Sequence, residues 1–177
     1  MGLKPLPCLS FIFTNQTGSL YIETSILGYL TARPTNNLIL AANTKVTQDW
    51  WETSRDEFTL YASELVQDEA AQGDGAIATQ RLSLLGPIAF LELTEAAITL
   101  AQVFLAQSSL PAKAANDALH MALATVYGLD YLLTWNCKHM ANAQIQKKLA
   151  QISGQLGYQL PIICTPYELM GYEPTEE

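Results

Sequence analysis

Residues 114–136 read AANDALHMALATVYGLDYLLTWN and contain a helix signal followed directly by a strand signal. Alanine and leucine dominate the first half, which predicts a helix covered by protein over most of its circumference and ending near Gly128. Residues 130–134 then have the composition of a short buried strand. A helix that leads at once into a strand is typical of a parallel α/β fold.

The same alternation runs along the rest of the chain. Five strands are expected, at residues 19–23, 57–62, 88–93, 130–134 and 161–164. Helices are expected at residues 26–30, 37–53, 64–72, 76–85, 94–108, 111–128 and 140–153, with capping residues at Thr24, Ser25 and Ser63 and a capping box at 165–168. Strands that alternate with helices in this way imply a parallel sheet covered on both faces.

The length and composition fit one globular domain. The chain has 177 residues, of which 49% are hydrophobic and 15% charged, so it can bury a core of its own. No apolar run reaches the roughly 20 residues that span a bilayer, and the first 13 residues make a poor signal peptide because prolines interrupt them. We therefore expect residues 1–18 to be a loosely attached extension and residues 19–177 to form the domain.

The net charge restricts which molecules the protein can bind, and the cysteine content indicates the redox state of its compartment. The net charge is −8, which is the wrong sign for unaided binding of nucleic acid, so a phosphate-bearing substrate would need bound cations or a local basic patch. A basic protein partner, by contrast, would be attracted. The three cysteines, Cys8, Cys137 and Cys164, have no paired metal-ligand spacing and are odd in number, which favours a reducing, cytoplasmic setting.

Asp117 is the only Asp, Glu, Lys or Arg between Lys113 and Asp130. A carboxylate in a largely covered helix is costly unless a cation, a metal or protonation compensates it. One interpretation is an ion pair with Lys113, four residues earlier on the same face. The other is a metal site, for which further carboxylates must converge. His120 is either a hydrogen-bonded, partly buried imidazole or a further ligand.

Two other oxygen-bearing side chains are expected beside the carboxyl ends of neighbouring strands. Glu23 is expected to end the first strand, and Asn136 lies two residues beyond Thr134 at the end of the fourth. Ligands of open parallel sheets bind beyond the carboxyl ends of the strands. Glu23 and Asn136 are therefore expected to face one crevice.

The position of Glu69 follows from helix periodicity. Glu69 shares a helix face with Leu65 and Val66, whereas Glu64 and Asp68 lie on other faces. If the apolar residues point inward, Glu69 points inward too. The alternative is that all three acids are ordinary surface residues.

Carboxylates that converge in this way predict a site for a hard divalent cation. Mg²⁺ or Mn²⁺ suits carboxylate, amide and water oxygens, lowers the pKa of a bound water and holds phosphate oxygens. The candidate ligands and catalytic residues are Glu23, Glu69, Asp117 and Asn136. Three nearby hydroxyls would either support the ligands or have the plain roles of helix capping and strand termination: Thr24, Ser25 and Thr134.

Other chemistries have little support. The sequence has no P-loop, no Gly-x-Gly-x-x-Gly turn and no Gly-x-Ser-x-Gly elbow. Cys137 and His139 are close in sequence, but nothing else favours a thiol mechanism.

Four motifs in order resemble those of a PIN domain, most closely the VapC-type toxin nucleases of toxin–antitoxin pairs. They are Tyr21-Ile22-Glu23-Thr24-Ser25, the pair Ser63 and Glu69, Asp117-Ala118-Leu119-His120, and Leu132-Leu133-Thr134-Trp135-Asn136, and residues 165–169 match the end of such domains. The resemblance covers residues 19–172. It implies a three-layer α/β/α sandwich with about five parallel strands, Mg²⁺- or Mn²⁺-dependent ribonuclease activity, homodimers and an antitoxin partner.

Two departures from the family pattern leave a second hypothesis open. Glu23 stands where aspartate is usual, and Asn136 removes a negative charge that would help to hold a second metal. The alternative is a catalytically weak or inactive binding protein whose acidic crevice accepts a basic segment of a partner. The helix at residues 37–53 is also longer than a minimal member needs. Its Trp50 and Trp51 belong either to an oligomer or antitoxin surface or, as is more usual, to the core.

Overall fold

The strands and helices alternate along the chain as expected. The structure is a computed structural model that describes residues 18–170, so the expected extension lies outside the described residues apart from Gly18. The strands are β1 (Gly18–Ile22), β2 (Phe58–Ser63), β3 (Ala89–Leu91), β4 (Tyr131–Leu133) and β5 (Ile162–Cys164). The α-helices are α1 (Thr24–Leu30), α2 (Leu38–Thr53), α3 (Glu64–Ala70), α4 (Gly75–Leu85), α5 (Glu95–Gln107), α6 (Ala115–Val126) and α7 (Ala143–Gln155).

The five strands form one parallel sheet in the order β3-β2-β1-β4-β5, which confirms the expected parallel sheet. The chain moves outward from β1 through β2 to β3, and then returns to place β4 on the other side of β1. The strand order therefore reverses between β1 and β4. In open α/β sheets this reversal point is where ligands bind.

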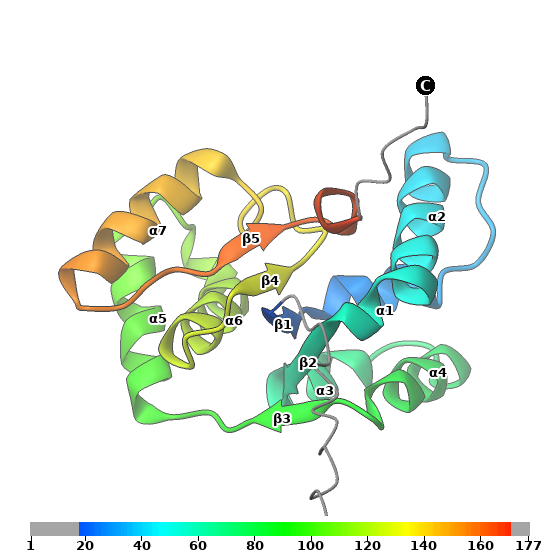
Figure 1. The fold of residues 1–177 in the computed structure, drawn as a ribbon, viewed down its shortest axis with the longest axis horizontal. Coiled ribbons are helices and arrows are strands. Elements are labelled where there is room, and N and C mark those ends of the chain that lie inside the picture. Colours follow the sequence, from blue (N-terminus) through cyan, green and yellow to red (C-terminus); the bar gives the residue numbers. More distant parts are fainter. Residues whose placement is uncertain (1–17, 171–177) are drawn as a thin grey trace, which may run out of the picture.

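Helices cover the sheet in two separate groups. Crossovers in parallel sheets are right-handed, so a change in the direction of travel puts the next helices on the opposite face. Accordingly α1 to α4 contact one another, whereas α5 contacts α6 and α7. Figure 1 shows α5, α6 and α7 on one side of the strands and α1, α2 and α4 on the other. This is the expected three-layer α/β/α sandwich.

Polar side chains set the helix starts that position the site. The Asn37 side chain accepts the N–H groups of Ile39 and Leu40 at the start of α2, and the Ser63 hydroxyl accepts that of Val66 at the start of α3. Near the end of the described chain, the 3₁₀ helix Pro166–Leu169 opens with the expected capping box, in which the Glu168 carboxylate accepts the Thr165 N–H at 2.8 Å. The turn predicted after Thr165 is therefore a 3₁₀ helix with Thr165 as its N-cap.

The core lies between the sheet and both helix layers. Trp50 and Trp51 are buried, and Trp50 stacks against Phe58, so the tryptophan pair belongs to the core. The free cysteines among the described residues are Cys137, which is exposed, and Cys164, which is buried. No helix between residues 18 and 170 is long and apolar enough to cross a bilayer.

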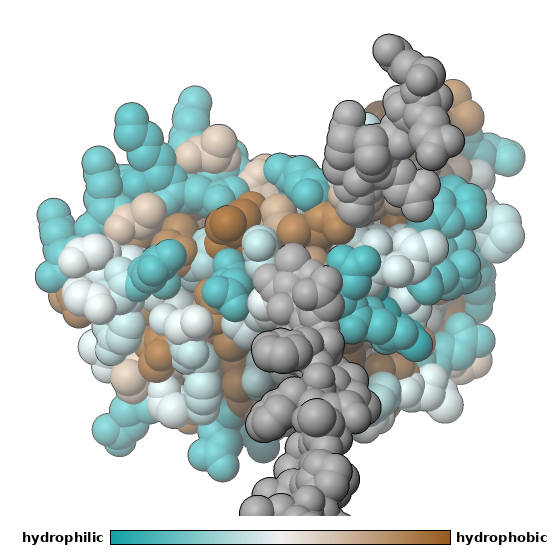
Figure 2. Space-filling view, viewed as in Figure 1, coloured by the Kyte–Doolittle hydropathy of each residue, from teal (hydrophilic) through white to brown (hydrophobic). Residues whose placement is uncertain are grey.

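The start of α2 carries exposed apolar side chains. Leu38 and Ile39 are 85% and 72% exposed, and Leu40 is also exposed. Figure 2 shows hydrophobic atoms at this end of the molecule, at the upper right, and a second group over β5, where Ile162 is exposed. The long helix therefore has a buried end at the tryptophans and an apolar, solvent-facing end.

Candidate metal centre

Glu23 lies where the strand order reverses. It directly follows β1, and its backbone N–H bonds the Leu133 carbonyl of β4 at 3.1 Å. The expectation that Glu23 ends the strand was wrong by one residue, because Glu23 is the N-cap of α1. The expected capping by Thr24 and Ser25 was also wrong. Thr24 begins the helix, and the Glu23 carboxylate accepts the Ser25 N–H.

The hydrogen bonds to Glu23 all reach one carboxylate oxygen. Oε2 accepts the Ser25 N–H at 3.1 Å, the Ser25 hydroxyl, and the Thr134 hydroxyl at 2.7 Å. The other carboxylate oxygen of Glu23, Oε1, accepts no hydrogen bond from residues 18–170. The side chain is nearly buried, at 7% exposed, so three donors fix its orientation while one oxygen stays available to a ligand.

Glu69 points inward from α3, as helix periodicity predicted, while Glu64 and Asp68 on the same helix are exposed. Its Oε2 accepts hydrogen bonds from the Thr24 hydroxyl and from His120 Nε2, which is 3.2 Å away. Its Oε1 accepts one from the Asn116 amide at 2.8 Å.

These contacts determine the charge of Glu69. Burial acts to raise the pKa of Glu69, but the hydrogen bonds and charge of His120, with hydrogen bonds from Thr24 and Asn116, outweigh burial and lower the pKa to about 2. The carboxylate is therefore ionised at neutral pH.

His120 lies deeper than expected. Its side chain is 1% exposed, and its Nδ1 is 2.9 Å from the Tyr21 hydroxyl, which is itself 2.6 Å from the Ser63 hydroxyl. Burial, more than any other factor, raises the pKa of Tyr21 well above its usual value, so this phenol keeps its proton. The expected hydrogen-bonded imidazole is present, and its partners Tyr21 and Glu69 come from β1 and α3.

Glu23, Glu69 and His120 form a compact group. Each has a ligand atom within 4.8 Å of those of the other two. Two carboxylates this close repel each other unless a cation separates them. Carboxylate oxygens suit Mg²⁺ and Mn²⁺, so the residues present fit a hard divalent ion.

Asp117 and Asn136 form a second part of the site. Asp117, on α6, contacts His139 Nδ1 through Oδ2 at 2.7 Å, and it is not a member of the compact group. Among residues 18–170 no ion pair joins Asp117 to Lys113, so that interpretation was wrong. Asn136 Oδ1 accepts the backbone N–H of His139 at 3.1 Å. His139 therefore holds both predicted ligands.

A hydrogen-bond bridge connects the two parts of the site. The Thr134 hydroxyl donates to Glu23 and accepts the backbone N–H of Asn136 at 2.9 Å. The Asn116 amide, next to Asp117 in sequence, reaches Glu69. The structure thus brings Glu23 and Glu69 into direct proximity and links Asn136 and Asp117 to them through Thr134 and His139.

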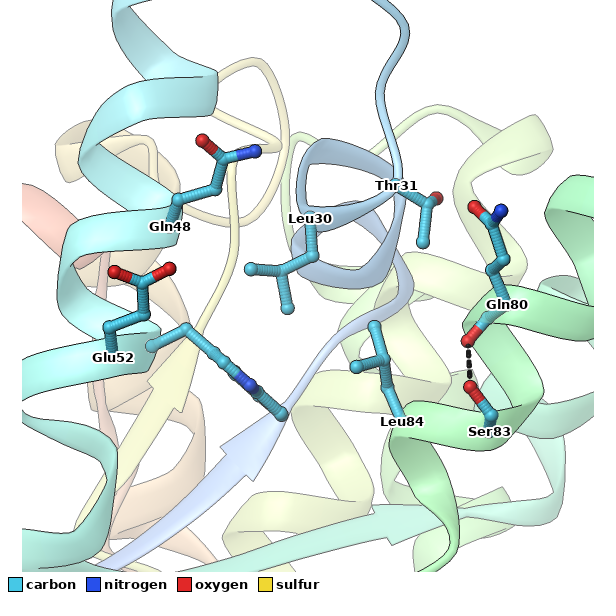
Figure 3. A pocket seen from close by; sticks show the side chains of 8 residues that line it. Leu30, Thr31, Gln48, Glu52, Gln80, Ser83 and Leu84 are labelled. Atoms are coloured by element: carbon cyan, nitrogen blue, oxygen red, sulfur yellow. Dashed lines mark hydrogen bonds between the residues drawn. The ribbon is translucent and has the colours of Figure 1, made fainter.

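A separate pocket opens between α1, α2 and α4. Its volume is about 500 Å³, and Figure 3 shows Leu30 and Leu84 facing each other across it, with Gln48 and Glu52 on one wall and Gln80 on the other. None of the four candidate ligands lines it.

Comparisons with known proteins identify the fold. No protein-family model and no curated protein matches the chain. Among solved structures, a chain of the VapBC2 complex from Rickettsia felis, bound to a promoter DNA fragment, aligns over 82% of this chain and 97% of its own, with 14% identity and a TM-score of 0.53. VapC20 from Mycobacterium tuberculosis, a Sarcin-Ricin loop cleaving toxin, aligns over 68% of this chain and 92% of its own, with 14% identity and a TM-score of 0.54.

At this identity the likeness concerns the fold. The chain has an α/β fold with a five-stranded parallel sheet, and it shares its fold with these two VapC-type structures, as the resemblance to PIN domains implied. Activity is a property of the site and not of the fold, so it is argued separately from the residues above.

Proposed function

We propose that the protein is a divalent-metal-dependent endoribonuclease that hydrolyses RNA phosphodiester bonds, and that it is the toxin of a toxin–antitoxin pair. The observation that carries the proposal is the group of Glu23, Glu69 and His120, whose ligand atoms lie within 4.8 Å of one another. This group sits where the strand order reverses, which is the ligand-binding position of open α/β sheets. The shared fold with VapC20, an RNA-cleaving toxin, supports the same activity.

In this proposal four residues hold Mg²⁺ or Mn²⁺: Glu23, Glu69 and Asp117 through carboxylate oxygens, and Asn136 as a neutral donor. A divalent ion bound there supplies the acidity that activates a water at neutral pH and offsets the charge of the phosphate. The protein orients the carboxylates through hydrogen bonds. Ser25 and Thr134 bind the same oxygen of Glu23, which leaves its other oxygen for the ion.

Positive side chains near the site would contact the RNA backbone. Lys113 lies four residues before Asp117, and Lys138 precedes His139. Both lysines are exposed and make no ion pair with residues 18–170. Arg33, by contrast, is paired with Asp74 at 3.2 Å. We expect Lys113 and Lys138 to bind phosphates, and the net charge of −8 to make binding strongly dependent on the metal.

The direct test is Mg²⁺-dependent cleavage of structured RNAs. Glu69→Gln and Asp117→Asn each remove one negative charge from the site while keeping the side-chain shape, and both should abolish cleavage. Glu64→Gln is the matched control, because Glu64 is an exposed acid on the same helix as Glu69. Equal activity of all three variants and the wild type would rule out the nuclease.

The toxin role implies partners for other surfaces of the molecule. The exposed Leu38, Ile39 and Leu40 at the start of α2 offer apolar contact area, and the acidic surface favours a basic antitoxin. We propose a cytoplasmic protein that forms homodimers and binds such an antitoxin. Light scattering of the purified protein, alone and with a protein encoded beside it, tests both assemblies.

A second candidate is an inactive binding protein with the same fold. It is favoured by the hydrogen bonds that already occupy Glu69, whose two oxygens accept from three side chains. In that case the acidic crevice accepts an arginine of a basic partner segment. Calorimetric titration with Mn²⁺ near neutral pH separates the two. Heat that disappears in Glu69→Gln supports the nuclease, and no heat in the wild type supports the binding protein.

A further inference from the structure

A chain of hydrogen-bonded side chains leads from the start of α3 to the candidate ligand Glu69. The Ser63 and Tyr21 hydroxyls are 2.6 Å apart, Tyr21 is 2.9 Å from His120 Nδ1, and His120 Nε2 is 3.2 Å from Glu69. Ser63, Tyr21 and His120 are each at most 2% exposed. Buried polar groups are costly unless every donor meets an acceptor, so the direction of each hydrogen bond can be worked out.

The donor and the acceptor of each hydrogen bond can be assigned by starting from the Glu69 carboxylate. An ionised carboxylate only accepts hydrogen bonds, so His120 Nε2 must carry a proton. When Nδ1 carries no proton it accepts, and the Tyr21 hydroxyl is its donor. The Tyr21 oxygen can in turn accept the Ser63 proton, while the Ser63 oxygen accepts the Val66 N–H at 3.4 Å. With these directions every buried donor in the chain has one acceptor.

We propose that Tyr21 and His120 are positioning residues that hold the Glu69 carboxylate in the orientation that binds the divalent ion, and that His120 is not itself a ligand. The proposal rests on the proposed nuclease function. Tyr21 anchors the imidazole at one nitrogen, and the other nitrogen anchors Glu69. Thr24 and Asn116 also bind Glu69, but they are less buried than His120, so His120 is its most rigidly held donor. Hydrogen-bond partners of this kind are worth about 10–100-fold in metal affinity.

If His120 were itself a metal ligand, its ring would be protonated at a different nitrogen. One ring nitrogen of His120 lies within 4.8 Å of ligand atoms of Glu23 and Glu69, and Nε2 is the nitrogen that contacts Glu69, so His120 as a ligand would direct an unprotonated Nε2 at the ion. Nδ1 would then carry the proton and donate to Tyr21. The protonated nitrogen of His120 therefore separates a positioning residue from a ligand.

Two measurements test the proposal. In ¹⁵N NMR spectra of the metal-free and the Mg²⁺-loaded protein, His120 should be protonated at Nε2. An unprotonated Nε2 would overturn the proposal. In Mn²⁺ titrations, Tyr21→Phe should weaken binding at least about 10-fold, and excess Mn²⁺ should restore kcat, because only the orientation of the ligand is lost.

Matched variants separate positioning from a general loss of structure. Tyr61→Phe removes the hydroxyl of the residue that pairs with Tyr21 across β1 and β2, and it should bind Mn²⁺ as the wild type does. His120→Gln keeps an N–H donor for Glu69 and should bind Mn²⁺ more tightly than His120→Leu. Thermal denaturation verifies that each variant is folded.

The outcomes distinguish this inference from the function on which it rests. A wild type that binds Mn²⁺ while Tyr21→Phe binds it equally well overturns the positioning role and leaves the nuclease intact. Failure of the wild type to bind Mn²⁺ overturns both the nuclease and the ion-binding part of this proposal.

Discussion

His139 Nδ1 lies 2.7 Å from Asp117 Oδ2, and the backbone N–H of the same histidine donates to Asn136 at 3.1 Å. One residue thus joins helix α6 to the turn that follows β4. The contact with Asp117 is not visible as a sequence pattern, because 22 residues separate the histidine from Asp117. The structural consequence is that two of the four candidate ligands depend on His139 for their orientation.

The first prediction concerns this residue. His139→Ala should lower RNA cleavage by about 10–100-fold, because a ligand that loses its hydrogen-bond partner is held less firmly. The measurement is kcat/KM at saturating Mg²⁺.

Cys137→Ala is the control for His139→Ala. Cys137 is an exposed cysteine in the same turn, and its loss should leave activity unchanged. If Cys137→Ala abolished cleavage, a thiol mechanism would replace the metal mechanism.

Thr134→Val should destabilise the protein and weaken Mn²⁺ binding. The Thr134 side chain is fully buried, and its hydroxyl donates to Glu23 and accepts from the backbone of Asn136. Removing a buried partner of a charged group costs about 1–3 kcal/mol in the free energy of unfolding. Urea denaturation and Mn²⁺ titration measure the two effects.

Thr125→Val is the matched control for that variant. Thr125 is equally buried, but its hydroxyl donates to the Met121 carbonyl within its own helix. This substitution should change stability only slightly and leave Mn²⁺ affinity unchanged. Equal metal affinities of the two valine variants would show that Thr134 does not orient Glu23.

Acid should remove the stabilisation that Glu69 provides. Its pKa is about 2 in the folded protein and 4.5 in the unfolded chain, so the unfolded state takes up its proton first as the pH falls. The stabilisation is therefore complete above pH 4.5 and is lost as the pH falls toward 2, by up to about 3 kcal/mol. In EDTA, the difference in free energy of unfolding between wild type and Glu69→Gln should shrink over this range. A difference independent of pH would contradict the burial and hydrogen bonding described for Glu69.

Asn136→Asp tests whether the neutral side chain at position 136 weakens metal binding. The Asn136 oxygen accepts the His139 N–H, and aspartate can accept it in the same way. The variant should therefore fold normally and bind Mn²⁺ more tightly or bind a second ion, because it adds a carboxylate. Calorimetry reports both quantities. Unchanged affinity and stoichiometry would mean that position 136 only orders the turn.

Local signals in the sequence predicted much of the fold. The cap at Ser63 and the capping box at residues 165–168 were confirmed, because short polar side chains at helix starts act on their own backbone. The inward direction of Glu69 followed from its spacing to Leu65 and Val66. These predictions needed only neighbours within one helical turn.

The missed features all depend on partners from distant elements. The sequence placed Tyr21 in the first strand and gave its side chain no role, yet its hydroxyl joins Ser63 to His120. Asp117 was assigned Lys113 or a metal as its partner, and the structure shows a contact with His139 that the sequence did not predict. Sequence spacing predicts which face a residue occupies, but the choice of partner depends on the packing of several elements. The metal roles of Glu23, Glu69, Asp117 and Asn136 stay predictions.

A crystal soaked in Mn²⁺ and measured at the manganese absorption edge tests the central claim most directly. The account predicts an anomalous peak within coordination distance of the carboxylates of Glu23 and Glu69, and its absence from Glu69→Gln crystals. An occupied manganese position elsewhere, with none beside these two carboxylates, would contradict it.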